Sequence, residues 1–193
     1  SSIKILSRTM PLKFHSTLKT MELFIIAMGK LGGKELNPSS DIDIIFYAPF
    51  KNSSVDSAEE FQEKEIFWVN VVKKILKTLS QISENGFLYR VDTRLRPFGN
   101  AGPMITSFSS LQNYFVKDAS DWERYAWTKF RICNSNVLLK EKEFLKQKIK
   151  LENMVNDFLY RPFPDFNMIG ALRLINRKII YHNRKKKQTD YFS

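Results

Sequence analysis

Two aspartates separated by one residue, Asp41 and Asp43, are the side chains of this sequence best placed to do chemistry. They belong to the run 41–47 (DIDIIFY), which predicts a strand. Alternate residues of a strand share a face, so both carboxylates point the same way while Ile42 and Ile44 face the core. Two carboxylates this close repel each other unless a cation lies between them, and Mg²⁺ is bound by carboxylates together with substrate phosphates. Alone, the pair fits two solvated carboxylates at a strand edge equally well.

A third carboxylate, Asp92, lies in the predicted strand 87–96, where Arg90 and Arg94 share its face. Taken alone, an aspartate between two arginines indicates an ion pair. A third carboxylate on a neighbouring strand is, however, what two-metal phosphoryl or nucleotidyl transfer requires. The arginines would then face phosphate oxygens, where their forked donors suit bidentate contacts.

A glycine-rich turn, residues 29–33 (GKLGG), precedes the first two aspartates. Without Cβ atoms, Gly32 and Gly33 would let the backbone approach a phosphate and offer N–H donors. A simple connecting turn is the alternative. Lys30 and Ser40 add a cation and a hydroxyl at the same place, which favours phosphate binding.

The surrounding elements predict an α+β fold, with a small mixed β-sheet flanked by helices and followed by a helical C-terminal segment. We expect a lead-in over 1–20, a catalytic domain over 21–135 and a helical segment with a basic tail over 136–193. The predicted elements are strands at 23–28, 41–47 and 87–96, a helix at 57–83 that covers the sheet, a capping box at Ser120 and Glu123, a helix at 137–159, and a last helix capped by Asp165 with Met168, Ile169, Leu172 and Ile175 at helical spacing.

Composition narrows the class of protein. The chain has 193 residues, 43% of them hydrophobic, and no apolar run near the roughly 20 residues of a membrane helix. Its two histidines lie far apart and its one cysteine, Cys133, is expected to be a small buried residue on a helix, which argues against zinc and against Ser-His or Cys-His catalysis. Any metal must therefore be held by oxygen. We expect a cytoplasmic protein, which may be a piece of a longer one.

The net charge of +11 raises the question of nucleic acid. The lysines are spread over 140–150 and 184–187, and a solvated helix face explains the first run. We do not expect nucleic acid as the partner.

Three blocks resemble one family. Residues 29–46 (GKLGGKELNPSSDIDIIF) closely resemble the nucleotidyltransferase motif of glutamine synthetase adenylyltransferase, a member of the DNA polymerase beta-like superfamily. Residues 89–99 with Gly102-Pro103, and residues 121–126 running on to Lys129 and Arg131, look like the same family in the same order. The resemblance covers most of 21–161.

The resemblance implies an enzyme with two homologous halves, one attaching AMP from ATP to a tyrosine of glutamine synthetase and the other removing it with inorganic phosphate as ADP. Residues 35–41 and 121–126 are more similar to the AMP-removing half. A nitrogen-signalling regulatory protein would act through regions that lie outside this sequence. The roles implied are two Mg²⁺ ions on Asp41 and Asp43 with Asp92 bridging or orienting, phosphate contacts from Gly32, Gly33, Ser40 and Lys30, cationic support from Arg94 and Arg96, and packing of the helix on the sheet by Trp122 and Tyr125.

Other interpretations stay open. Glu123 and Arg124 fit either structural ion pairing or support of the site. The family chain is several times longer, so a fragment or an eroded, inactive gene product is conceivable, although the three carboxylates are intact. The remaining alternatives are the ATP-dependent adenylylating reaction, a relative that modifies a small molecule or tRNA, and a non-catalytic basic module that binds nucleic acid; the 94–97 and 122–125 blocks argue against the small-molecule or tRNA enzyme.

Overall fold

The computed structural model describes residues 23–49, 58–80, 82–83, 86–87, 89–134 and 140–160, and positions 170, 173–174, 176–178 and 180–181. The predicted lead-in 1–20 and the predicted helix cap Asp165 lie outside these residues. The elements in chain order are β1 (Phe24–Ala27), α3 (Gly29–Gly32), β2 (Ile42–Tyr47), α4 (Ala58–Leu79), β3 (Ile82–Ser83), β4 (Gly86–Phe87), β5 (Val91–Asp92), η2 (Gly99–Ala101), β6 (Ile105–Thr106), α5 (Phe108–Lys117), α6 (Asp121–Trp127), β7 (Arg131–Ile132) and α7 (Glu141–Leu159).

A five-stranded mixed sheet forms around β2. Strand β1 pairs antiparallel with β2 on one side and with β7 on the other. Strands β5 and β6 both pair parallel with β2, Val91 opposite Ile42 near its start and Ile105 opposite Phe46 near its end. The predicted α+β class with a small mixed sheet is therefore confirmed.

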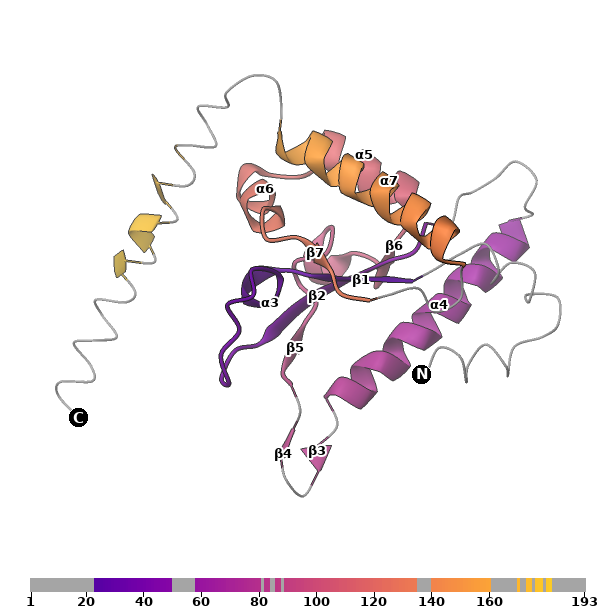
Figure 1. Cartoon of the computed structure of the whole chain (residues 1–193), viewed down its shortest axis with the longest axis horizontal. Helices are drawn as coiled ribbons and strands as arrows, with labels where there is room; N and C mark the ends of the chain where they lie inside the picture. Colours follow the sequence, from indigo (N-terminus) through magenta and orange to yellow (C-terminus); the bar gives the residue numbers. More distant parts are fainter. Residues whose placement is uncertain are drawn as a thin grey trace.

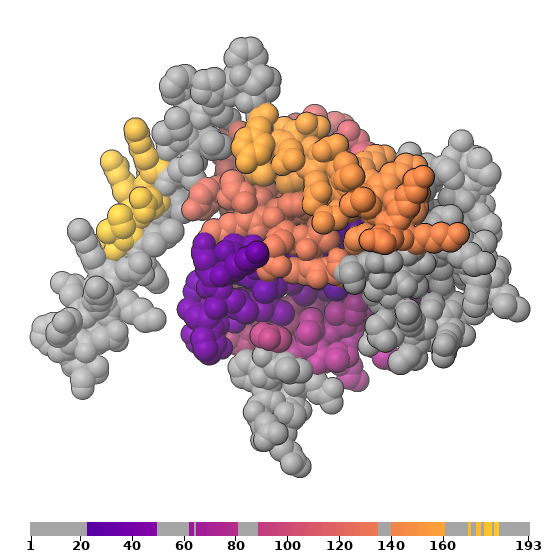
Figure 2. All heavy atoms as spheres, in the orientation of Figure 1, coloured from indigo at the N-terminus to yellow at the C-terminus, as the bar shows by residue number. Residues whose placement is uncertain are grey.

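Helices cover both faces of this sheet: α5 and α7 lie on one side and α4 on the other (Figure 1). The alternation along β2 explains this, because Ile45 and Tyr47 join the core under α5 and α7, whereas Ile44 and Phe46 pack with Trp68 of α4. In the space-filling view the orange atoms of α7 lie above the indigo and magenta atoms of the strands and α4 (Figure 2). The helices described here include none with an apolar run long enough to cross a membrane.

The predicted third strand, 87–96, is wrong as one element. Gly86–Phe87 form a hairpin with Ile82–Ser83, which ends the predicted helix 57–83 early at Leu79, and Val91–Asp92 form a separate strand. Strand β5 stops because the Asp92 carboxylate accepts a hydrogen bond from the Arg94 backbone N–H at 2.8 Å. Aspartate side chains that bond the backbone two residues on make turns, so Arg94 lies in a turn rather than on the strand face.

Helix α6 also differs from expectation. Trp122 and Tyr125 are 48% and 45% exposed, so the prediction that they pack the helix against the sheet is wrong. Arg124 and Trp127, three residues apart, form the buried face of this seven-residue helix, and Trp127 packs edge-on against Phe115. The other face therefore carries Trp122 and Tyr125.

The open question about Glu123 and Arg124 has a structural answer. Glu123 completes the predicted capping box with Ser120 and accepts a short hydrogen bond from the Tyr114 hydroxyl. Arg124 is buried, with its guanidinium 5.5 Å from the Phe158 ring centroid and 3.7 Å from Asp121. Both residues hold α6 in place. Cys133 is exposed and follows β7, so its predicted burial on a helix is wrong.

Candidate active site

The structure places Asp43 directly opposite Asp92 in the parallel pairing of β2 and β5. Paired strands lie about 4.8 Å apart, so the two side chains leave neighbouring positions on the sheet. The pairing is extended by the Ile42 N–H, which donates to the Arg90 carbonyl at 2.8 Å. The sequence-predicted residues Asp41, Asp43 and Asp92 are thus brought to one end of the sheet.

Electrostatics shows how close the three carboxylates are. Partial burial raises the pKa of Asp43, and the negative charges of Asp92 and Asp41 raise it further. The positive charges of Arg94 and Lys30 oppose this rise in the pKa of Asp43. A cation among the three carboxylates would relieve the same repulsion.

Arginines contact the other two carboxylates. Arg90 Nε lies 2.7 Å from Asp41 Oδ1, and its Nη2 donates to the Ser39 carbonyl at 2.9 Å. Arg94 donates through Nε and Nη2 to Asp92 Oδ2, at 2.8 and 2.5 Å. These hydrogen bonds from Arg94 hold the pKa of Asp92 below its usual value. Both arginine side chains are largely exposed, so their heads can turn toward a ligand.

Gly29 makes room for Asp43, a role that sequence reasoning missed. Its φ is +52°, and a Cβ at this position would lie 2.3 Å from Asp43 Oδ2. Glycine adopts positive φ without the steric cost that other residues meet there. The signal in the sequence was the glycine directly after the strand 23–28, but its relation to Asp43 depends on the pairing of β1 with β2.

The glycine-rich stretch is a single helical turn rather than an open loop. The N–H groups of Gly32 and Gly33 donate to the carbonyls of Met28 and Gly29, at 2.8 and 3.0 Å. Both predicted phosphate donors are therefore engaged within the turn. Gly32 has a structural reason to lack a side chain, since its Cβ would lie 1.9 Å from the Lys129 carbonyl oxygen.

Contacts from β7 and its approach fix this helical turn. Arg131 donates from Nη2 to the Leu31 carbonyl at 2.6 Å and from Nε to the Gly32 carbonyl at 3.2 Å. Lys129 Nζ lies 2.6 Å from Glu35 Oε2. These two residues come from a block that the sequence analysis noted without assigning roles.

Lys30 and Ser40, both predicted to bind phosphate, lie together. Lys30 Nζ donates to Ser40 Oγ at 3.3 Å, and the Ser40 hydroxyl makes a short hydrogen bond to Asn37. Because Lys30 also acts on the pKa of Asp43, this cation lies beside the carboxylates. The arrangement can attract a phosphate to the edge of the site.

Arg96 lies differently from the predicted phosphate ligands. It is 7% exposed and donates from Nη1 to the Thr93 carbonyl and hydroxyl, at 2.9 and 2.8 Å. Nε donates to the Gly102 carbonyl at 3.4 Å. The guanidinium holds the loop that follows β5, and its contact with phosphate stays a prediction.

The donor set fits a hard divalent cation in type, since Asp41, Asp43 and Asp92 offer carboxylate oxygens. Within the residues described, however, no group of three His, Cys, Asp or Glu side chains is arranged to enclose a metal ion. The ion pairs of Asp41 with Arg90 and of Asp92 with Arg94 explain this, because the arginines turn both carboxylates toward themselves. Binding of Mg²⁺ here stays a prediction, and it requires these two carboxylates to reorient.

A mixed sheet with helices on both faces, and carboxylates on adjacent strands beside a glycine-rich helical turn, defines a nucleotidyltransferase-like core. The family model described as glutamate-ammonia ligase adenylyltransferase matches residues 3–147. The chain belongs to the glutamate-ammonia ligase adenylyltransferase family.

Three relatives, each named bifunctional glutamine synthetase adenylyltransferase/adenylyl-removing enzyme, align with most of the chain. Those of Shewanella loihica and Mannheimia haemolytica are each 38% identical, over 168 and 172 residues, covering 87% and 89% of this chain. That of Psychromonas ingrahamii is 41% identical over 167 residues, 86% of this chain. The alignments cover 17% of each relative, so the chain matches about a sixth of their length.

Proposed function

We propose that this chain carries a Mg²⁺-dependent nucleotidyltransferase site that acts on glutamine synthetase and removes AMP from an adenylylated tyrosine by phosphorolysis. The observation that supports it is the side-by-side placement of Asp43 and Asp92, with Asp41 close enough to raise the pKa of Asp43. The names of the relatives supply the protein substrate. The direction, AMP removal, rests on the resemblance of residues 35–41 and 121–126 to the AMP-removing half.

In the proposed reaction an oxygen of inorganic phosphate attacks the α-phosphorus of the tyrosine-bound AMP. The bond between that phosphorus and the tyrosine oxygen breaks, and the tyrosine oxygen takes a proton from solvent. The products are ADP and unmodified tyrosine. A phenol has a pKa of about 10, so the leaving oxygen accepts the electron pair more readily than an aliphatic hydroxyl would. Mg²⁺, when held by Asp41, Asp43 and Asp92, would supply positive charge opposite the phosphate oxygens.

The chain's own cations would bring two anionic groups together. Lys30, beside Ser40 at the rim, would attract the incoming phosphate. Arg94, whose exposed head now contacts Asp92, would turn to the phosphate oxygens, where a planar fork makes two parallel hydrogen bonds. Gly29 would keep Asp43 within reach by leaving its carboxylate unobstructed.

The test is to incubate the chain with adenylylated glutamine synthetase, Mg²⁺ and inorganic phosphate, and to measure ADP together with the AMP left on the protein. We expect ADP in proportion to the AMP lost, with no ADP after chelation of Mg²⁺ or with Asp43→Asn. A matched control is Asp157→Asn, which changes a carboxylate on α7 that lines a separate groove.

Each other outcome excludes part of the proposal. If AMP stays on glutamine synthetase, AMP removal by this chain is excluded. If the chain instead attaches AMP to unmodified glutamine synthetase from ATP, the site is a nucleotidyltransferase of the opposite direction. If Asp43→Asn retains full activity, the carboxylate cluster is not the reaction centre.

A further inference from the structure

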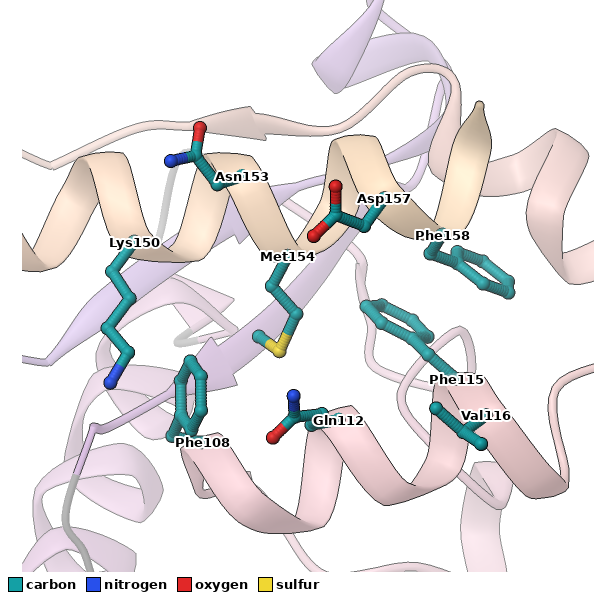
Figure 3. A pocket seen from close by; sticks show the side chains of 9 residues that line it. All are labelled: Phe108, Gln112, Phe115, Val116, Lys150, Asn153, Met154, Asp157 and Phe158. Atoms are coloured by element: carbon teal, nitrogen blue, oxygen red, sulfur yellow. The ribbon is translucent and has the colours of Figure 1, made fainter. Parts of the chain in front are cut away.

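A groove runs between α5 and α7, on different elements from the three carboxylates. Its volume is about 580 Å³. Phe115 and Phe158 stack with ring centroids 4.1 Å apart at one end, and Lys150 Nζ lies 3.9 Å from the Phe108 ring centroid at the other. The Met154 side chain projects between the two helices (Figure 3). The two helices therefore run in the same direction and present a largely apolar trough.

The trough is open to solvent. Val116, on its α5 side, is 74% exposed. Polar side chains lie along it as well, among them Asn153 and Asp157. Apolar side chains that two packed helices leave uncovered are usually buried by a third element, and a helix fits a trough between two helices.

The sequence after α7 has the pattern of such a helix. Met168, Leu172, Ile175 and Ile179 recur at i, i+4, i+7 and i+11, which is one narrow apolar stripe. The described positions 170, 173–174, 176–178 and 180–181 are helical. Leu174 and Tyr181, seven residues apart on the face opposite the stripe, are exposed. The stripe is an apolar helix face that the site chemistry does not use.

The connection has the right length for a return. Helix α7 ends at Leu159, one residue after Phe158 at the end of the trough. Residues 160–167 form an eight-residue connection with two prolines, and helix–helix connections of two to eight residues are common. A helix over 168–181 is about 21 Å long at 1.5 Å per residue, while the trough along α7 from Lys150 to Phe158 is about 12 Å.

We propose that residues 168–181 fold back antiparallel to α7 and seat the stripe of Met168, Leu172, Ile175 and Ile179 in the trough between α5 and α7. The described positions of this segment lie apart from the trough in Figure 1, so the docked arrangement is a second conformation of the chain. Docking covers Val116 and leaves Leu174 and Tyr181 in solvent. It places Met168 and Leu172 near Val116, and Ile179 near Phe108.

The experiment traps the docked form with a disulfide in the full chain. Cys133 is first replaced by serine, and Val116→Cys is then combined with Leu172→Cys. A disulfide requires Cα atoms within about 7 Å, so it reports close approach. The matched control combines Val116→Cys with Leu174→Cys, two residues along the chain but on the opposite helix face. Mild oxidation of dilute protein is followed by non-reducing electrophoresis and mass spectrometry.

We expect cross-linked monomer from the Leu172 pair, several-fold more than from the Leu174 pair, and independent of protein concentration. Equal yields from both pairs would mean that the segment visits the trough without a seat. Disulfide-linked dimers in place of monomer would mean that a second copy fills the trough. Either result overturns the proposal, as does the absence of any disulfide.

A second measurement avoids dependence on one cysteine geometry. A fluorophore sensitive to polarity is attached at Val116→Cys in the chain with Cys133→Ser, and its emission is compared after adding Leu172→Asp or Leu174→Asp. We expect a red shift with Leu172→Asp, because an aspartate in the stripe opposes docking, and no shift with Leu174→Asp. The proposal is wrong if the two aspartates have the same effect. Circular dichroism melting checks that each variant is folded.

Discussion

Asp43 and Asp92 lie opposite each other on parallel strands, and their carboxyl pKa values are displaced in opposite directions. Burial and the charges of Asp92 and Asp41 raise the pKa of Asp43, whereas hydrogen bonds from Arg94 lower that of Asp92. One carboxylate is therefore held as an anion by its own cation, while its neighbour is left in a field that disfavours its charge. A site in this state has a direct electrostatic reason to take up a cation.

Replacing Asp43 with asparagine should stabilise the folded chain near neutral pH. Because the pKa of Asp43 is raised in the folded state, ionised Asp43 disfavours folding. This penalty develops as the pH rises from the unfolded pKa of about 3.9 through the folded pKa, and it is complete at neutral pH. We expect a higher Tm for Asp43→Asn than for the wild type at pH 7, and no difference below about pH 4. A lower Tm at pH 7 would show that the Asp43 carboxylate stabilises the fold.

Gly29→Ala should damage the site more than its backbone strain alone predicts. Its Cβ would lie 2.3 Å from Asp43 Oδ2. The matched control is Gly99→Ala, which has a similar φ, +55° against +52°, but whose Cβ would meet its nearest atom, the Arg94 carbonyl, at 3.5 Å. Both variants should lose about 1 kcal/mol of stability from left-handed backbone strain. Only Gly29→Ala should also abolish nucleotidyl transfer and metal binding; equal activity in the two variants would separate Gly29 from the positioning of Asp43.

Arg94→Gln should raise the pKa of Asp92. The hydrogen bonds and charge of Arg94 hold that pKa low, so the stability that the ion pair contributes is present above the unfolded pKa and is lost as the pH falls through the folded pKa. Carboxyl carbon NMR titration of Asp92 in wild type and variant measures the shift directly. An unchanged titration of Asp92 would mean that Arg94 is turned to solvent in solution.

The positions of Asp41, Asp43 and Asp92 followed from local rules. Alternation in residues 41–47 put both aspartates of β2 on one face, and the strand containing Asp92 paired with β2 as the chemistry required. The capping box of Ser120 and Glu123 followed from spacing alone, because it involves neighbours within one turn.

Other features depended on contacts between distant residues. Strand β5 is short because the Asp92 side chain bonds the backbone of Arg94, a choice that residue type permits without requiring. Trp122 is exposed and Trp127 is buried because α6 meets the core through its Arg124 face, which depends on Phe115 and Phe158. The need for glycine at position 29 arises from Asp43, and at position 32 from Lys129.

Gly32→Ala should destabilise the chain strongly, whereas Gly33→Ala should be tolerated. The added methyl at position 32 meets the backbone carbonyl of Lys129 at 1.9 Å, and overpacking of this kind costs about 3 kcal/mol. At position 33 the nearest atoms belong to the flexible side chains of Glu35 and Lys129, at 3.1 and 3.2 Å, which can move aside. Urea unfolding of the two variants checks the difference. Similar midpoints would mean that the α3 turn is not fixed against Lys129.

The most direct test of the carboxylate cluster is Mn²⁺ binding, measured by electron paramagnetic resonance on the wild type, Asp43→Asn and Asp92→Asn, with Asp157→Asn as a control. We predict saturable binding to the wild type and the control, with a rise in thermal stability of roughly 2.7 kcal/mol when the ion is at a hundred times its Kd. Both site variants should lose the binding while staying folded. Unchanged Mn²⁺ affinity in folded Asp43→Asn and Asp92→Asn would contradict a shared metal site between β2 and β5.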